Sequence, residues 1–126
     1  MESTLFTKDC TIAISTSLSP SFSLNGAFAI VGIIMPAAWD AADLTFQISM
    51  DPLVGTPADA TPTNFYNVYD DSGGEVTVTA STSRAMMLSQ NVLIAGNHYK
   101  IRSGTAGSAV AQTAARTLTV IYRRVG

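Results

Sequence analysis

Charged side chains are scarce in this sequence, at 13% of 126 residues against about 25% in a typical soluble domain. Seven basic and nine acidic residues give a net charge of −2, and Arg123-Arg124 is the nearest approach to a basic cluster. Nucleic-acid binding needs lysines and arginines gathered on one face, so we expect no nucleic-acid partner. The polar surface must come from Ser, Thr, Asn, Gln and Gly, which is typical of adhesive modules and of protein-shell subunits.

Cysteine and histidine occur once each, as Cys10 and His98. A single cysteine excludes an internal disulfide, and one of each residue is too few for a structural zinc site. Cys10 lies close to Ile12 and Ile14, and we expect it to pack as a small hydrophobic residue. No spacing argument joins it to His98, so a catalytic Cys-His pair is not expected.

Long apolar runs are also absent. The most apolar stretch, residues 27–38, contains Gly32 and Pro36 and is shorter than the roughly 20 residues that span a bilayer. Residues 1–4 lack the basic start and apolar core of a signal peptide. We therefore expect a protein made in the cytoplasm that has no membrane partner.

Alternation of apolar and polar residues is the strongest pattern present, and its period of two predicts β-strands. Residues 44–50 alternate without a fault, and Tyr99 and Ile101 are the apolar positions of a second such run. Thr and Val recur in these runs and favour the pleated surface. The strands predicted in this way, with less regular ones, cover residues 10–15, a piece around Phe22, 27–35, 44–50, 64–69, 75–81, 98–102 and 113–122.

Two of these predicted strands are not simply alternating. Residues 27–35 are apolar at nearly every position, which predicts a strand covered by the core on one face and by a neighbouring subunit on the other. In residues 113–122, Leu118, Val120 and Tyr122 form one face. A buried helix is the alternative for residues 27–35, which their β-branched residues and Gly32 disfavour. Single helical turns are candidates at residues 37–43 and 109–115.

Turn residues separate these strands. The sequence Asp70-Asp71-Ser72-Gly73-Gly74 is a good hairpin loop between two of them. About eight short strands in a chain of this length predict an all-β fold, an antiparallel β-sandwich of jelly-roll type. Residues 10–126 would form this domain, and residues 1–9 are a candidate N-terminal arm that orders on a neighbour.

Acidic residues are the first candidates for chemistry. The loop around Asp70 and Asp71, with Glu75, offers oxygen ligands for calcium, but its spacing is not that of an EF-hand and is ordinary in hairpins. Paired acids for a glycosidase would come from this group and Asp51, yet nothing places two of them across a cleft. We expect no enzymatic activity, no cofactor and no metal.

Aromatic residues are the candidates for a carbohydrate site. Trp39 or Tyr66 would stack on a sugar, with Asp70 and Asp71 as polar contacts. The alternative for Trp39 is that it plugs one end of the sandwich, because a large aromatic near a strand end usually completes the core.

Three segments carry a resemblance to known families: residues 42–51, 65–70 and 98–105. They resemble the discoidin-like, galactose-binding-like jelly roll. The segment from Tyr99 to Arg116 is more similar to small jelly-roll accessory virion proteins of tailed bacteriophages and gene-transfer agents. In the sugar-binding relatives the binding residues lie in loops, which here are rich in Ala, Gly, Thr and Pro. That departure favours packing against copies of the chain and a larger lattice.

This resemblance and the composition together predict a virion structural protein, made in the host cytoplasm and located in the virion. We expect a capsid decoration or cement protein that bridges subunits of a tailed-phage head, with itself, as a trimer, and the major capsid protein or another virion protein as partners. A glycan-binding module of a tail or fibre is the alternative, and portal, tail and baseplate positions stay open. The candidate interface residues are Phe6, Phe28, Ile30, Ile34 and Arg123.

Overall fold

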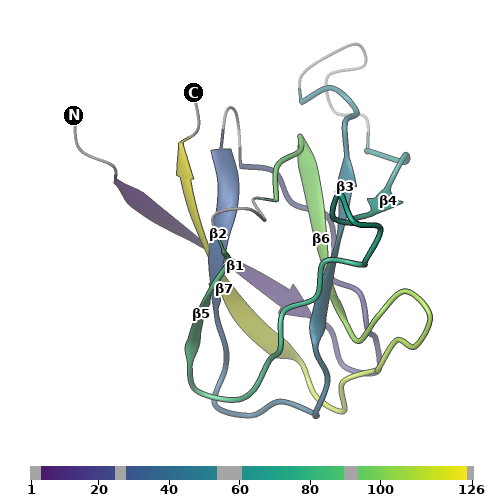
Figure 1. Cartoon of the computed structure of the whole chain (residues 1–126). Coiled ribbons are helices and arrows are strands. Elements are labelled where there is room, and N and C mark those ends of the chain that lie inside the picture. Colours follow the sequence, from purple (N-terminus) through teal and green to yellow (C-terminus); the bar gives the residue numbers. More distant parts are fainter. Residues whose placement is uncertain (1–3, 25–27, 54–60, 90–93, 125–126) are drawn as a thin grey trace.

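The structure, a computed structural model, describes residues 4–24, 28–53, 61–89 and 94–124, and these contain strands and no helix. Seven strands form two antiparallel sheets that face each other (Figure 1). The first sheet has the order β1-β7-β2-β5 and the second the order β4-β3-β6. This arrangement confirms the predicted all-β sandwich. The strands are β1 (Leu5–Ile12), β2 (Phe28–Ile34), β3 (Leu44–Ser49), β4 (Tyr66–Asn67), β5 (Ala85–Met87), β6 (His98–Ser103) and β7 (Arg116–Arg124).

An eighth, irregular segment lies along β6. Leu18 bridges Arg102, and Phe22 bridges Tyr99 through backbone hydrogen bonds of 2.9 and 2.8 Å. The piece predicted around Phe22 is therefore an irregular edge of the second sheet. Two other expectations differ from the structure. Residues 75–81 make only isolated bridges at Glu75 and Val78, and the short strand β5 was not expected.

The core fills the space between the sheets, and alternation predicted most of its residues, whereas Ile14 and Met50, the last apolar residues of two alternating runs, are exposed. Leu44 and Phe46 of β3 are fully buried, as are Ile101 of β6 and Leu118 and Val120 of β7. Successive side chains of a strand point to opposite faces, so each regular strand gives one row to the core. Tyr99, Cys10 and Ile12 belong to the same cluster, which confirms that Cys10 packs as a small hydrophobic residue.

Strand β2 corrects one expected interface residue. Ile30 has no exposed surface and packs in the core of its own sandwich, so it is not available to a partner. A register shift between Ile30 and Gly32 resets the alternation, after which Ile33 is buried and Ile34 is exposed. An apolar run does not reveal such a shift, because every residue in it is apolar enough to be buried in the core.

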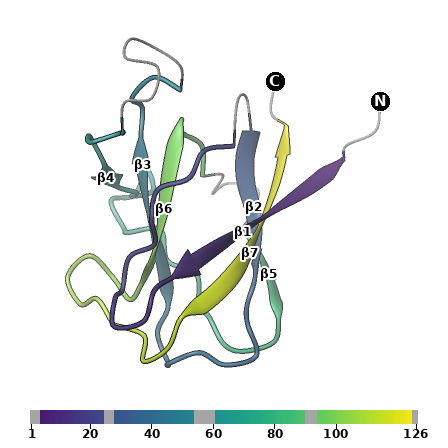
Figure 2. The same ribbon diagram turned by 180° about the vertical axis from the view of Figure 1, so that it is seen from behind.

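The N-terminal segment belongs to the first sheet. β1 pairs with β7 along its whole length, from Leu5 opposite Arg123 to Ile12 opposite Arg116. The boundary expected between residues 9 and 10 therefore falls inside one strand, and residues 1–3 lie outside the described residues. The N-terminal half of β1 extends away from the second sheet, and both chain ends lie at the same end of the sandwich (Figures 1 and 2).

The structure has no helical turn at residues 37–43 or 109–115, and the side chain of Gln112 connects the two segments. Gln112 is fully buried, and its Oε1 accepts hydrogen bonds from the Asp40 N–H at 2.8 Å and Arg116 Nε at 3.1 Å. Its Nε2 donates to Ser103 Oγ and to the Asp40 carbonyl.

The described part of the chain has no helix with the length and hydrophobicity of a membrane span.

Candidate functional surface

The outer side of the first sheet is the candidate surface. Leu118 and Val120 of β7 point into the core, so the alternate residues of β7 and their cross-strand neighbours face outward. We call this the outer sheet face. It consists of Leu5, Thr7, Asp9 and Thr11 of β1, Thr117, Thr119, Ile121 and Arg123 of β7, Gly32 and Ile34 of β2, and Ala85 and Met87 of β5.

Large apolar side chains are exposed on this face. Leu5 is 54% exposed, Ile34 39% and Met87 58%. Asp9 and Arg123 are its only charged members. Exposed apolar side chains on a face with few charges are a common sign of an interaction site.

Gly32 lies in the middle of the outer sheet face, where there is no room for a side chain. A Cβ on Gly32 would lie 2.7 Å from the Met87 sulfur and 3.2 Å from Cδ1 of Ile121. The Met87 side chain thus lies across the glycine, where a longer residue on β2 would push it outward. Because methionine is flexible, this surface can adapt to a partner.

A threonine ladder borders the apolar part. Thr11 and Thr117 share a hydrogen bond of 2.9 Å between their hydroxyls, and Thr119 donates to the Asp9 carboxylate at 3.2 Å. These residues are exposed or partly exposed, so this side of the face offers hydroxyl groups and one carboxylate to a partner.

An aromatic cluster lies at the end of the first sheet where both chain termini emerge. Phe6 stacks on Tyr122 at 5.5 Å between ring centroids, and Phe28 meets both rings edge-on at 5.7 and 5.2 Å. Arg124 lies 5.5 Å above the Phe28 ring. Phe6 is 37% exposed. Of the expected interface residues, Phe6 and Phe28 thus lie in this cluster, and Ile34 and Arg123 lie on the outer sheet face.

The expected sugar-stacking residues are not brought together. Trp39 packs on the core before β3 begins, and its Nε1 donates to the Ala42 carbonyl at 2.9 Å. Tyr66 is 65% exposed and lies in β4 opposite Ile48. Ile48 is about 13 Å along β3 from Leu44, where β3 begins after the segment that contains Trp39. Trp39 therefore fits the alternative role of closing one end of the sandwich.

The acidic loop folds as the predicted hairpin. Tyr69 bridges Glu75, and the Asp70 carboxylate accepts hydrogen bonds from the N–H groups of Ser72 and Gly74 at 2.9 and 3.0 Å. Asp71 is exposed. Within the described residues no three acidic, His or Cys side chains gather in a way that would hold a metal ion.

A polar network on the outside of the second sheet was not predicted from the sequence. Arg102 is buried, with Nη1 3.2 Å from Glu75 and Nη2 2.7 Å from Asn67 Oδ1. Glu75 also accepts the Ala106 N–H at 3.1 Å. The network fastens the hairpin and the loop after β6 onto the sheet. An arginine at an outward position of an alternating strand carries no signal that loops will cover it.

The remaining reactive groups have structural surroundings. Burial raises the pKa of Cys10. Cys10 lies in the first sheet and His98 in the second, where the His98 ring contacts the Pro52 carbonyl. The Asp51 carboxylate accepts hydrogen bonds from the Asn64 side chain and from the N–H groups of Thr63 and Asn64, which lower its pKa. The Asp51 side chain thus holds residues 63 and 64 close to residue 51.

Comparisons with known proteins give no further assignment. No family model matches this sequence, and no match was found among curated proteins or among solved structures.

Proposed function

We propose that this protein is a virion structural protein, a capsid decoration or cement protein that stabilises the head of a tailed phage by bridging capsid subunits. The observation that carries the proposal is the outer sheet face, where Leu5, Ile34 and Met87 are exposed and only two residues are charged. A protein of this kind acts through binding energy alone, and burying apolar area supplies most of such energy.

The chain order supports the jelly-roll part of this proposal. With residues 17–22 counted beside β6, eight segments form two layers of four, ordered β1-β7-β2-β5 and 17–22-β6-β3-β4. Every segment except β4 lies in the layer opposite its predecessor along the chain. Two such four-membered layers are the architecture of jelly rolls, which occur in viral capsid proteins.

The direct experiment adds purified protein to phage capsids that lack it. We expect saturable binding and a higher melting temperature of the particle. Ile34→Lys combined with Leu5→Lys should abolish binding, because both charges would replace exposed apolar side chains of the outer sheet face. Met50→Lys is the matched control, since Met50 is 62% exposed just after β3 in the other sheet. Absence of binding by the unmodified protein, or equal loss in the control, would count against the proposal.

Glycan binding is the second candidate, and the exposure of Tyr66 and Tyr69 favours it. Both rings are more than half exposed, on and just after the edge strand β4. A glycan array is the test: specific binding that Tyr66→Ala removes and Trp39→Phe preserves would support a carbohydrate module and displace the cement proposal.

A further inference from the structure

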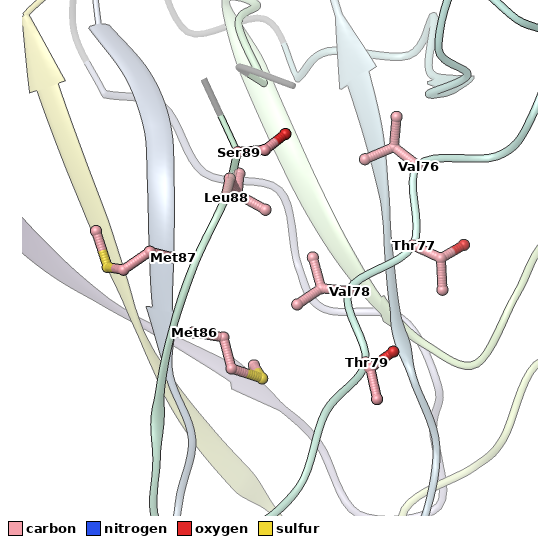
Figure 3. A pocket seen from close by; sticks show the side chains of 8 residues that line it. All are labelled: Val76, Thr77, Val78, Thr79, Met86, Met87, Leu88 and Ser89. Atoms are coloured by element: carbon pink, nitrogen blue, oxygen red, sulfur yellow. The ribbon is translucent and has the colours of Figure 1, made fainter. Parts of the chain in front are cut away.

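Two neighbouring strand edges enclose a cavity at the side of the sandwich. The cavity has a volume of about 400 Å³ and lies between residues 76–79, at the edge of the second sheet, and residues 86–89, which begin in β5 at the edge of the first (Figure 3). We call it the edge slot. Its size falls within the range of ordinary ligand sites.

The apolar lining of the edge slot continues the core. Val78, Met86 and Leu88 are each partly buried and pack against the core cluster. Their remaining surface is exposed where a sandwich would normally be closed. Thr77, Thr79 and Ser89 are exposed and line the slot beside them.

Residues 76–79 also have unused backbone groups. Val78 donates to and accepts from Leu44 at 2.9 Å in both directions. In an extended chain the backbone groups of the adjacent residues point the other way. Neither Thr77 nor Thr79 forms a backbone hydrogen bond with any described residue. These groups form a free edge that borders the slot.

The sequence of this edge is that of a complete strand. Val76-Thr77-Val78-Thr79 alternates β-branched residues, the best strand formers, yet the structure pairs it only through isolated contacts. Proteins usually protect such edges with lysine, proline or a bulge. Neither 76–79 nor 85–89 contains a charged residue, a proline or a glycine.

We propose that the edge slot accepts an extended peptide segment of a partner protein, which adds as a β-strand along residues 76–79 and places alternate apolar side chains into the slot. The free backbone groups select an extended chain, the half-covered Val78, Met86 and Leu88 select apolar residues at alternate positions, and the uncharged lining selects a neutral segment. The proposal deepens the assembly role proposed above and rests on it for the identity of the partner.

A synthetic peptide tests this with the intact chain. The probe has four Val-Thr repeats between one Lys and one Glu, and the control peptide has the same composition with the valines grouped. Binding is followed by NMR of the ¹⁵N-labelled protein. We expect amide shifts confined to residues 76–79 and 85–89, and binding weaker by roughly tenfold for the grouped peptide or for a probe N-methylated at one pairing amide.

Protein variants localise the site. Thr77→Lys and Thr79→Lys place a protective charge on the slot edge and should weaken binding by roughly tenfold or more, whereas Thr63→Lys, at an exposed position outside the slot and the outer sheet face, should not. Shifts along β1, equal affinity for the grouped peptide, or no binding at millimolar peptide would overturn the proposal. If the protein binds capsids but not the peptide, the peptide proposal for the edge slot is wrong and the capsid proposal for the outer sheet face stands. If it binds the peptide but not capsids, only the capsid proposal is wrong.

Discussion

Two glycines with positive φ allow the cost of an unusual backbone angle to be separated from the cost of a steric clash. Gly73 has φ of +87° and Gly104 has φ of +93°, so alanine is strained at both. A Cβ on Gly73 would meet nothing within 4 Å. On Gly104 it would lie 2.5 Å from the Ser108 carbonyl oxygen and 2.7 Å from the Val110 nitrogen, both backbone atoms.

The expected magnitudes follow from these contacts. Gly73→Ala should lower the free energy of unfolding by about 1 kcal/mol, the cost of a left-handed angle. Gly104→Ala adds the displacement of the Ser108 carbonyl and the Val110 nitrogen, which disrupts two bonds: the 2.9 Å bond from Val110 N to the Ser103 carbonyl and the 3.1 Å bond from Thr105 N to the Ser108 carbonyl. At about 1 kcal/mol for each lost hydrogen bond, we expect a total of about 3 kcal/mol.

Urea unfolding followed by circular dichroism measures both values, and Gly107→Ala is the control. Gly107 has neither a positive φ nor an atom within 4 Å of an added Cβ, so this variant should be neutral or slightly stabilising. Equal destabilisation by Gly73→Ala and Gly104→Ala would show that the loop after β6 does not lie against Gly104, and would refute this description.

Three further predictions concern charged and reactive groups. The Arg116 hydrogen bond lowers the pKa of Asp40 in the folded state. The stabilisation from this ion pair is therefore present above the unfolded pKa of about 3.9 and is lost as the pH falls through the folded pKa, and Asp40→Asn should flatten the acid limb of a stability-pH curve. The Cys10 thiol should resist a thiol reagent until denaturant is added, and rapid modification of folded protein would contradict its burial. Arg102→Met should cost about 3 kcal/mol by leaving Glu75 without its ion-pair partner, and adding Glu75→Gln should restore part of this; additive losses in the double-mutant cycle would argue against the pair.

Strands with strict alternation could be predicted for most of their apolar positions, although in the run 44–50 Met50 is 62% exposed and the polar residues Thr45 and Ser49 are fully buried. Leu44 and Phe46 follow a period of two in the sequence and are fully buried in the structure, because a sandwich covers one face of each strand. The same pattern predicted a regular strand at residues 75–81, where the structure has only isolated bridges. The local preference for a strand is strong there, but the fold supplies few pairing partners. β5 was missed because three residues are too few for a period to appear.

The candidate surface was only partly accessible to sequence reasoning. Ile34 and Ile30 are chemically alike, and only the register shift at Gly32 places one outside and the other inside. The burial of Arg102 depends on loops that lie over it from distant parts of the chain. Such contacts are set by tertiary structure and leave no local pattern.

Electron cryo-microscopy of capsids prepared with and without the protein tests the central claim most directly. The account predicts additional density at the joints between capsid subunits, into which the sandwich fits with β1, β7, β2 and β5 turned toward the shell. Density confined to the tail or baseplate, density that contacts the shell only through the second sheet, or no added density on the particle would contradict it.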